Sequence, residues 1–249
     1  MFGLQILILI VSVVAGAAAI AFSRLGEARN LKLLTAFSGA YLIGLTCLHL
    51  MPEVFASTKE PHWQIGAFIL AGFFVQIILE NFSRGLEHGH SHPPHGPLPY
   101  SMLMGLCIHA FLEATPLGVD PHAHAHAHDH VHEHNPSLLL AAIAIHKFPV
   151  AIVLLAMLQQ SGITKSRVWI LFGIFAVMAP LGALAGNLPF LAGRHHWLLA
   201  IVIGIFMHVS TTILFESEEG HRVNRQKGIA IALGAILAAG TVAFSTHQH

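Results

Sequence analysis

Runs of apolar residues, each long enough to cross a bilayer, follow one another along the whole chain. A membrane-spanning helix needs about 20 consecutive apolar residues, and the sequence supplies such a run eight times. The predicted spans cover residues 2–22, 32–52, 63–83, 98–118, 137–160, 168–192, 197–215 and 228–246. The pattern predicts an all-α polytopic membrane protein, with one domain over residues 1–249. A cleaved signal is the alternative for the first span, although no basic segment precedes it and its apolar run is long.

Composition agrees with this reading. The 249 residues are 55% hydrophobic and 10% charged, with a mean hydropathy of +0.68, whereas a globular domain is typically about 25% charged. The formal net charge is zero, so nothing favours a nucleic-acid partner. Both cysteines, Cys47 and Cys107, lie in apolar segments. They read first as small buried residues, with metal ligation as the alternative.

Lysine and arginine are distributed unevenly between the two ends of the predicted spans. The connections after the first, third, fifth and seventh spans hold nine of them: Arg24, Arg29, Lys32, Arg84, Lys165, Arg167, Arg222, Arg225 and Lys227. The other connections hold Lys59 and Arg194, and Lys147 lies inside a span. Because basic connections stay in the cytoplasm, we expect both termini on the outer side of a plasma (inner) membrane.

Two connections are rich in histidine. The predicted cytoplasmic connection, residues 84–97, contains His88, His90, His92 and His95. In the predicted outer connection, residues 119–136, seven histidines alternate with other residues: His122, His124, His126, His128, His130, His132 and His134. A tract of this kind is typical of metal binding, so we expect low-affinity collection of metal there. A passive solvated loop is the alternative.

Ionisable residues lie at membrane depth in the fourth and fifth spans, where such side chains by default mark function. His109 and Glu113 are four residues apart and share a helical face. His109 and His146 each lie nine residues from the outer end of their span, which is about 13 Å at the α-helical rise. An antiparallel pair of helices would bring all three to one metal ion. Pro149 would also free the carbonyl of Ile145.

Other readings of these residues stay open. Either histidine by itself could be a hydrogen-bonded core residue, and Glu113 and Lys147 could form a buried ion pair that only sets helix register. Two imidazoles and a carboxylate at matched depth favour a site for a first-row divalent cation such as Zn²⁺, Fe²⁺ or Mn²⁺.

Further polar residues could line a path to and from this site. His49 and Glu53 end the second span on the outer side, where they line an entrance or cap a helix. Glu80 lies near the cytoplasmic end of the third span, and His208 lies within the seventh. Glu216 follows the seventh span and belongs to an exit path or to a solvated charge cluster.

Taken in order, these motifs resemble the ZIP family of divalent-metal transporters. The matches are residues 47–53 (Cys-Leu-His-Leu-Met-Pro-Glu), the His-x-x-x-Glu of the fourth span, the His-x-x-Pro of the fifth and the Pro-Leu-Gly at residues 180–182. The resemblance implies eight helices with the fourth and fifth at the centre, metal uptake into the cytoplasm, inverted repeats and frequent homodimers. It also implies that the protein is not an enzyme.

Several positions depart from the family pattern. Ala110 and Ala114 replace the Asn and Gly of the fourth-span motif, Lys147 and Val150 replace ligand-type residues in the fifth, and Ala179 replaces an acidic residue in the sixth. Family members can hold two adjacent ions. Here His109, Glu113 and His146 match the first site, and the second is almost entirely lost. The hypothesis is a single-metal site in which the Lys147 ammonium stands in for the second ion.

Three functions follow from these observations. The first is transport of Zn²⁺ or another divalent cation into the cytoplasm, with one repeat rocking about the site. The second is a metal-sensing or scaffold protein that has lost transport, which the missing ligands favour. The third is a membrane-embedded metal hydrolase, since two histidines and a carboxylate leave room for an activated water. The sequence contains no His-Glu-x-x-His helix that would support the third.

Overall fold

The computed structural model describes residues 2–22, 28–83, 100–119, 136–215 and 225–246, and everything below refers to these ranges. They are helical apart from short turns, and they contain no strand. The helices are α1 (Phe2–Phe22), α2 (Ala28–Leu45), α3 (Met51–Ala56), α4 (His62–Ser83), α5 (Tyr100–Ala114), α6 (Pro136–Gln160), α7 (Lys165–Gly186), α8 (His195–Phe215) and α9 (Arg225–Thr246).

Eight of the described helical segments are long and apolar enough to cross a membrane, as predicted. The second is longer than predicted. It runs from Arg29 to Ala56, because a π-helical turn over Thr46–Leu50 joins α2 to α3. The sixth is shorter than predicted, because α7 ends at Gly186 and a 3-10 turn over Pro189–Leu191 follows. Pro189 lacks the N–H that a continuing helix would need.

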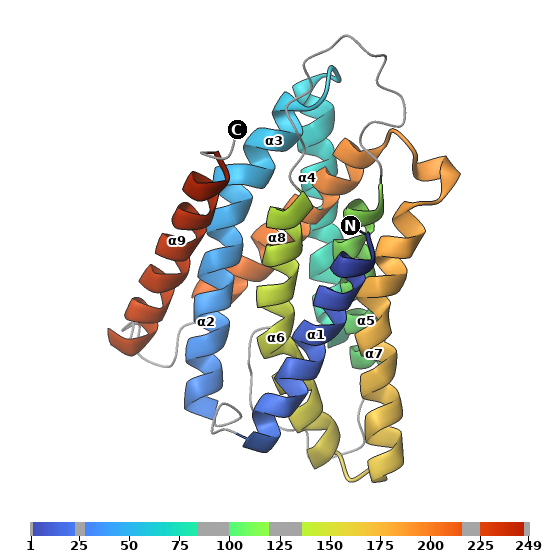
Figure 1. Cartoon of the computed structure of the whole chain (residues 1–249), viewed down its shortest axis with the longest axis vertical. Helices are drawn as coiled ribbons and strands as arrows, with labels where there is room; N and C mark the ends of the chain where they lie inside the picture. Colours follow the sequence, from blue (N-terminus) through green and yellow to red (C-terminus); the bar gives the residue numbers. More distant parts are fainter. Residues whose placement is uncertain (1, 23–27, 84–99, 120–135, 216–224, 247–249) are drawn as a thin grey trace.

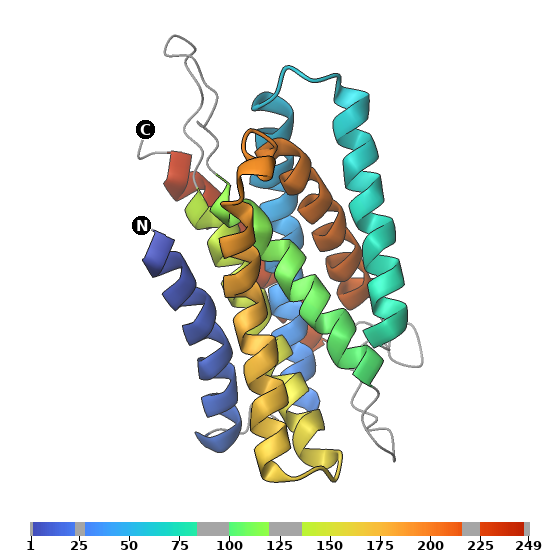
Figure 2. The same cartoon turned by 90° about the vertical axis from the view of Figure 1, so that its right-hand side faces the viewer.

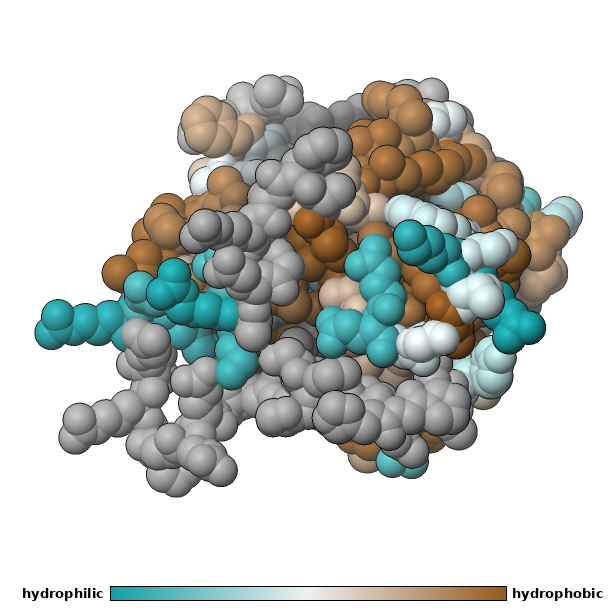
Figure 3. Space-filling view, turned by 90° about the horizontal axis from the view of Figure 1, so that it is seen from below, coloured by the Kyte–Doolittle hydropathy of each residue, from teal (hydrophilic) through white to brown (hydrophobic). Residues whose placement is uncertain are grey.

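The helices form one elongated bundle, with the start of α1 and the end of α9 at the same end (Figures 1 and 2). The opposite end carries six described basic residues: Arg29, Lys32, Lys165, Arg167, Arg225 and Lys227. We call it the basic end. Seen from below, it presents hydrophilic residues between apolar ones (Figure 3). Lys59 and Arg194 lie at the other end, so the described basic residues divide between the ends as the sequence predicts.

Four helix pairs pack most extensively: α4 with α8, α2 with α9, α1 with α6, and α5 with α7. Glycines bring the paired backbones together. A Cβ on Gly72 of α4 would strike the carbonyl oxygen of Ile201, and one on Gly204 of α8 would strike that of Ile69. Gly182 of α7 lies against the carbonyl of Phe111 in the same way. Small residues are what allow such close helix contact within membranes.

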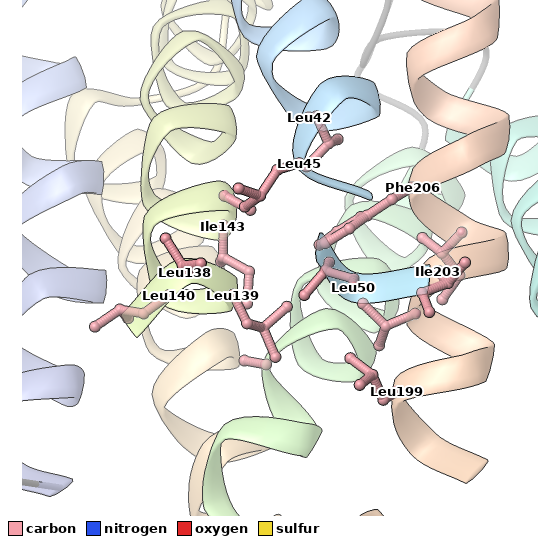
Figure 4. Packing of buried hydrophobic residues seen from close by; sticks show 14 of the residues in the cluster. Leu42, Leu45, Leu50, Leu138, Leu139, Leu140, Ile143, Leu199, Ile203 and Phe206 are labelled. Atoms are coloured by element: carbon pink, nitrogen blue, oxygen red, sulfur yellow. The ribbon is translucent and has the colours of Figure 1, made fainter. Parts of the chain in front are cut away.

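The central helices and the peripheral helices bury very different shares of their surface. The spans that contain α5 and α6 are 67% and 78% buried, against 11% for α9 and 22% for α1 and for α4. The peripheral helices expose large apolar side chains such as Leu7, Phe74 and Ile236, which suits contact with lipid tails. Leucine, isoleucine and phenylalanine side chains from α2, α6 and α8 pack together in the core between these three helices (Figure 4).

Candidate metal site

The buried ionisable side chains gather where α5 crosses α6 at the centre of the bundle. The exposed fraction of the residue is 3% for His109, 0% for Glu113, 1% for His146 and 2% for Lys147. Burying even one charge is costly unless it is paired and hydrogen-bonded, so the contacts of each side chain decide what this cluster can do.

Glu113 lies between two nitrogen-bearing side chains. Its Oε2 is 3.3 Å from Nε2 of His109, one turn earlier on α5. Its Oε1 forms an ion pair with the ammonium of Lys147 on α6. The two carboxylate oxygens therefore face different groups, and the carboxylate can bind a cation through Oε2 while it stays paired with Lys147 through Oε1.

Lys147 contacts an aromatic ring in addition to its ion pair with Glu113. Its Nζ lies 5.3 Å from the centre of the Phe175 ring on α7. An aromatic face attracts an ammonium most strongly where water is excluded. The ring on one side and the carboxylate on the other fix the position of this charge.

His146 lies beside His109, with the two rings in an edge-to-face arrangement. The ring centres are 6.1 Å apart, with an interplanar angle of 74°. Two imidazoles on one tetrahedral ion have ring centres roughly 5 Å apart, so the rings would have to approach by about 1 Å. In the part of the chain that the structure describes, no three His, Cys, Asp or Glu side chains already form a set that could hold a metal ion.

Gln76 also contacts the site, which its sequence pattern does not predict. Its side-chain Oε1 lies 2.9 Å from Nδ1 of His109, and the residue is fully buried on α4. The sequence carries one signal for it, since Gln76 precedes Glu80 by four residues and so shares a helical face with it. Nothing in the sequence indicates which helix that face meets.

Apart from Lys147, the positions that depart from the family pattern line the interior with apolar groups. Ala110, Ala114, Val150 and Ala179 are all buried, at 6% exposure or less. None of these four side chains carries an atom that could bind a metal ion.

His49 and Glu53 meet at the end of the bundle opposite the basic end. Nε2 of His49 is 3.2 Å from Oε2 of Glu53. His49 belongs to the π-helical turn and Glu53 to the first turn of α3. A π-helical turn inside an α-helix is rare and frequently occurs at functional sites. The two side chains are 20% and 15% exposed, whereas Nε2 of His49 is itself buried.

Glu80 and His208 form a second polar pair, nearer the basic end. The carboxylate of Glu80 on α4 pairs with Nε2 of His208 on α8, and the His208 ring meets the edge of Phe73 at 4.9 Å between centres. The sequence placed these residues in different spans without predicting their contact. Glu216 and the histidines of residues 84–97 and 122–134 lie outside the described residues.

Comparison with protein families gives a match. The family model described as ZIP Zinc transporter matches residues 98–241, more than half of the chain. That stretch begins just before α5 and ends within α9, so it includes His109, Glu113, His146 and Lys147. No curated protein matches the sequence significantly.

Proposed function

The chain belongs to the ZIP family of zinc transporters and is a multi-pass membrane protein with helices apolar enough for eight spans; from that premise, we propose that it moves a divalent metal cation into the cytoplasm through the site between α5 and α6. Zn²⁺ is the substrate we favour, and Fe²⁺, Mn²⁺ and Cd²⁺ are the alternatives. The direction rests on the basic end facing the cytoplasm of a plasma membrane, as the positive-inside rule predicts.

The separation of His109 and Glu113 is the observation that carries this proposal. Nε2 and Oε2 face each other at 3.3 Å inside the bundle. Two ligand atoms on one tetrahedral Zn²⁺ ion also lie about 3.3 Å apart, given typical Zn–N and Zn–O distances. This pair therefore matches the spacing that a bound ion requires, and His146 would complete the ligand set when the rings approach.

The two polar pairs on either side of the site suggest the route. A cation would enter past His49 and Glu53, lose water at His109, Glu113 and His146, and leave past Glu80 and His208. The seven histidines between His122 and His134 would collect metal at the outer mouth, and Glu216 would lie at the exit. Several sites of moderate affinity suit conduction, which requires an ion to leave as readily as it enters.

Lys147 gives the site its distinctive charge. We propose that its ammonium replaces a second metal ion, which leaves a single-metal site. The ion pair with Glu113 and the buried alanine and valine at the other departed positions support this assignment. Native mass spectrometry is the test: one tightly bound ion is expected between α5 and α6, and two would contradict the proposal.

Uptake by proteoliposomes loaded with a metal-sensitive dye tests the function as a whole. The wild type should accumulate Zn²⁺, while His109→Ala and Glu113→Ala should reduce uptake to background. His62→Ala is the matched control, since this exposed histidine lies outside the site with its ring against Phe55. It should leave uptake unchanged.

A metal sensor without transport is the second candidate, because the pairing of Glu113 with Lys147 already satisfies one carboxylate oxygen of the site. The same liposomes separate the two functions. Intact metal binding with no flux of Zn²⁺, Fe²⁺, Mn²⁺ or Cd²⁺ would establish the sensor and end the case for a transporter.

A further inference from the structure

Gln76 is a buried carboxamide on α4, and the other fully described residues that α4 buries are apolar. Its exposure is 0%, and the neighbouring inward positions of α4 are Ile65, Gly72 and Leu79. A buried amide costs free energy unless it is hydrogen-bonded. The observed partner is the imidazole of His109 on α5, at 2.9 Å between Oε1 and Nδ1.

The chemistry of this bond decides which nitrogen of His109 can bind a metal. The amide oxygen of Gln76 only accepts hydrogen bonds, so this bond, with Oε1 facing the ring, requires Nδ1 to be the donor. In the neutral ring the lone pair then lies on Nε2, the atom that is 3.3 Å from the carboxylate of Glu113. Metal-binding histidines commonly have this arrangement, in which the second ring nitrogen donates to an oxygen that fixes tautomer and orientation.

We propose that Gln76 is a positioning residue for the metal site: it holds His109 in the tautomer and orientation that present Nε2, next to Glu113, to the transported cation. This inference rests on the proposed function and goes beyond it by naming the ligand atom and the residue that selects it.

The close packing of α4 against α8 holds the backbone around Gln76 in place. One turn before Gln76, Gly72 lies directly against the backbone of α8, and Gly204 of α8 lies against the backbone of α4. These contacts leave α4 little freedom to shift relative to α8. A side chain anchored on such a helix can fix the position of a ring on the neighbouring α5.

Zinc-uptake kinetics of the full-length protein in proteoliposomes test the role. Gln76→Leu removes the acceptor at similar size, and the KM for Zn²⁺ should rise about 10–100-fold, as it does when the hydrogen-bond partner of a ligand is lost. Gln76→Glu keeps an oxygen acceptor and should hold KM within about threefold of wild type. Ser210→Ala is the control: it removes another fully buried polar group, on α8, and should leave KM unchanged.

The outcomes separate positioning from simple helix attachment. If Gln76 only fastens α4 to α5, Gln76→Leu will lower the melting temperature and the maximal rate while KM stays within twofold, and that result overturns the proposal. If Gln76→Leu does not fold, Gln76→Met replaces it, and an unchanged KM in that variant overturns the proposal equally. A wild type that takes up no metal would instead refute the proposed function itself.

Discussion

Glu113 and Lys147 neutralise each other where neither could remain charged alone. Their exposures are 0% and 2%, and they form an ion pair between α5 and α6. Breaking a buried pair by removing one partner costs about 3–5 kcal/mol, because it leaves an uncompensated charge. Replacing both partners with neutral groups can be nearly neutral for stability.

This asymmetry gives a prediction for Lys147. Lys147→Met should destabilise the metal-free protein by about 3–5 kcal/mol, and the double variant Glu113→Gln, Lys147→Met should recover most of that loss. Thermal unfolding in detergent measures both. Zn²⁺ should stabilise Lys147→Met more than the wild type, since the ion supplies the missing positive charge. Equal stabilisation of the two proteins would contradict the role of Lys147 as a substitute cation.

The route has its own prediction at the same scale. Glu80→Gln removes the carboxylate charge that pairs with His208 at the inner side of the site. If metal leaves past this pair, the maximal rate of uptake should fall severalfold while KM stays near its wild-type value. A raised KM with an unchanged maximal rate would place Glu80 outside the exit.

The sequence anticipates contacts along one helix better than contacts between helices. A spacing of four residues correctly indicates that His109 and Glu113, and likewise His49 and Glu53, approach each other. The partnership of Gln76 with His109 depends on how α4 is rotated against α5, which hydropathy does not encode. The ligand roles of these residues stay predictions at this stage.

At the scale of single helices, the length of an apolar run predicts where a span lies but not the irregular turns within it. The π-helical turn at Thr46–Leu50 leaves no mark in hydropathy, since it changes hydrogen bonding and not composition. Pro149 would free the carbonyl of Ile145, yet α6 continues through the proline from Pro136 to Gln160. A proline removes one backbone donor, and the surrounding packing keeps the helix together.

Glycines provide the sharpest prediction about elements. Gly182 and Gly173 both lie on α7, but a Cβ on Gly182 would strike the backbone of Phe111, whereas one on Gly173 would meet open space. Gly182→Ala should therefore destabilise the protein by about 1–3 kcal/mol or more. Gly173→Ala should be neutral or stabilise it by up to about 1 kcal/mol. Melting temperatures of the two variants decide, and similar values would mean that α5 and α7 are less closely packed.

At the scale of the whole molecule, the sequence indicates class, number of spans and family, because hydropathy and motif order determine these. The family match confirms membership, and six of the described basic residues lie at one end as predicted. The sequence could not predict that α4 packs against α8, or α2 against α9, because all the apolar helices present similar hydrophobic surfaces. Those choices depend on where glycines allow two backbones to meet.

The glycine contacts also determine where the bundle can move. A helix cannot slide along its partner when a carbonyl oxygen of one rests on a glycine of the other, as at Gly72 and Gly204. The proposed transport requires motion that opens the site to each side in turn, and we expect this motion between pairs. One such boundary lies between α2 and α6, where Phe37 and Phe148 line an apolar groove of about 350 Å³.

Chemical cross-linking would test whether movement occurs between helix pairs and not within them. In a background without Cys47 and Cys107, cysteines replacing Phe68 and Trp197, which stack between α4 and α8, should tolerate a bifunctional thiol reagent with transport intact. The same reagent between cysteines replacing Phe37 and Phe148 should stop transport reversibly. These two results together would show that the pair held by glycine contacts is rigid and that the hinges lie between pairs.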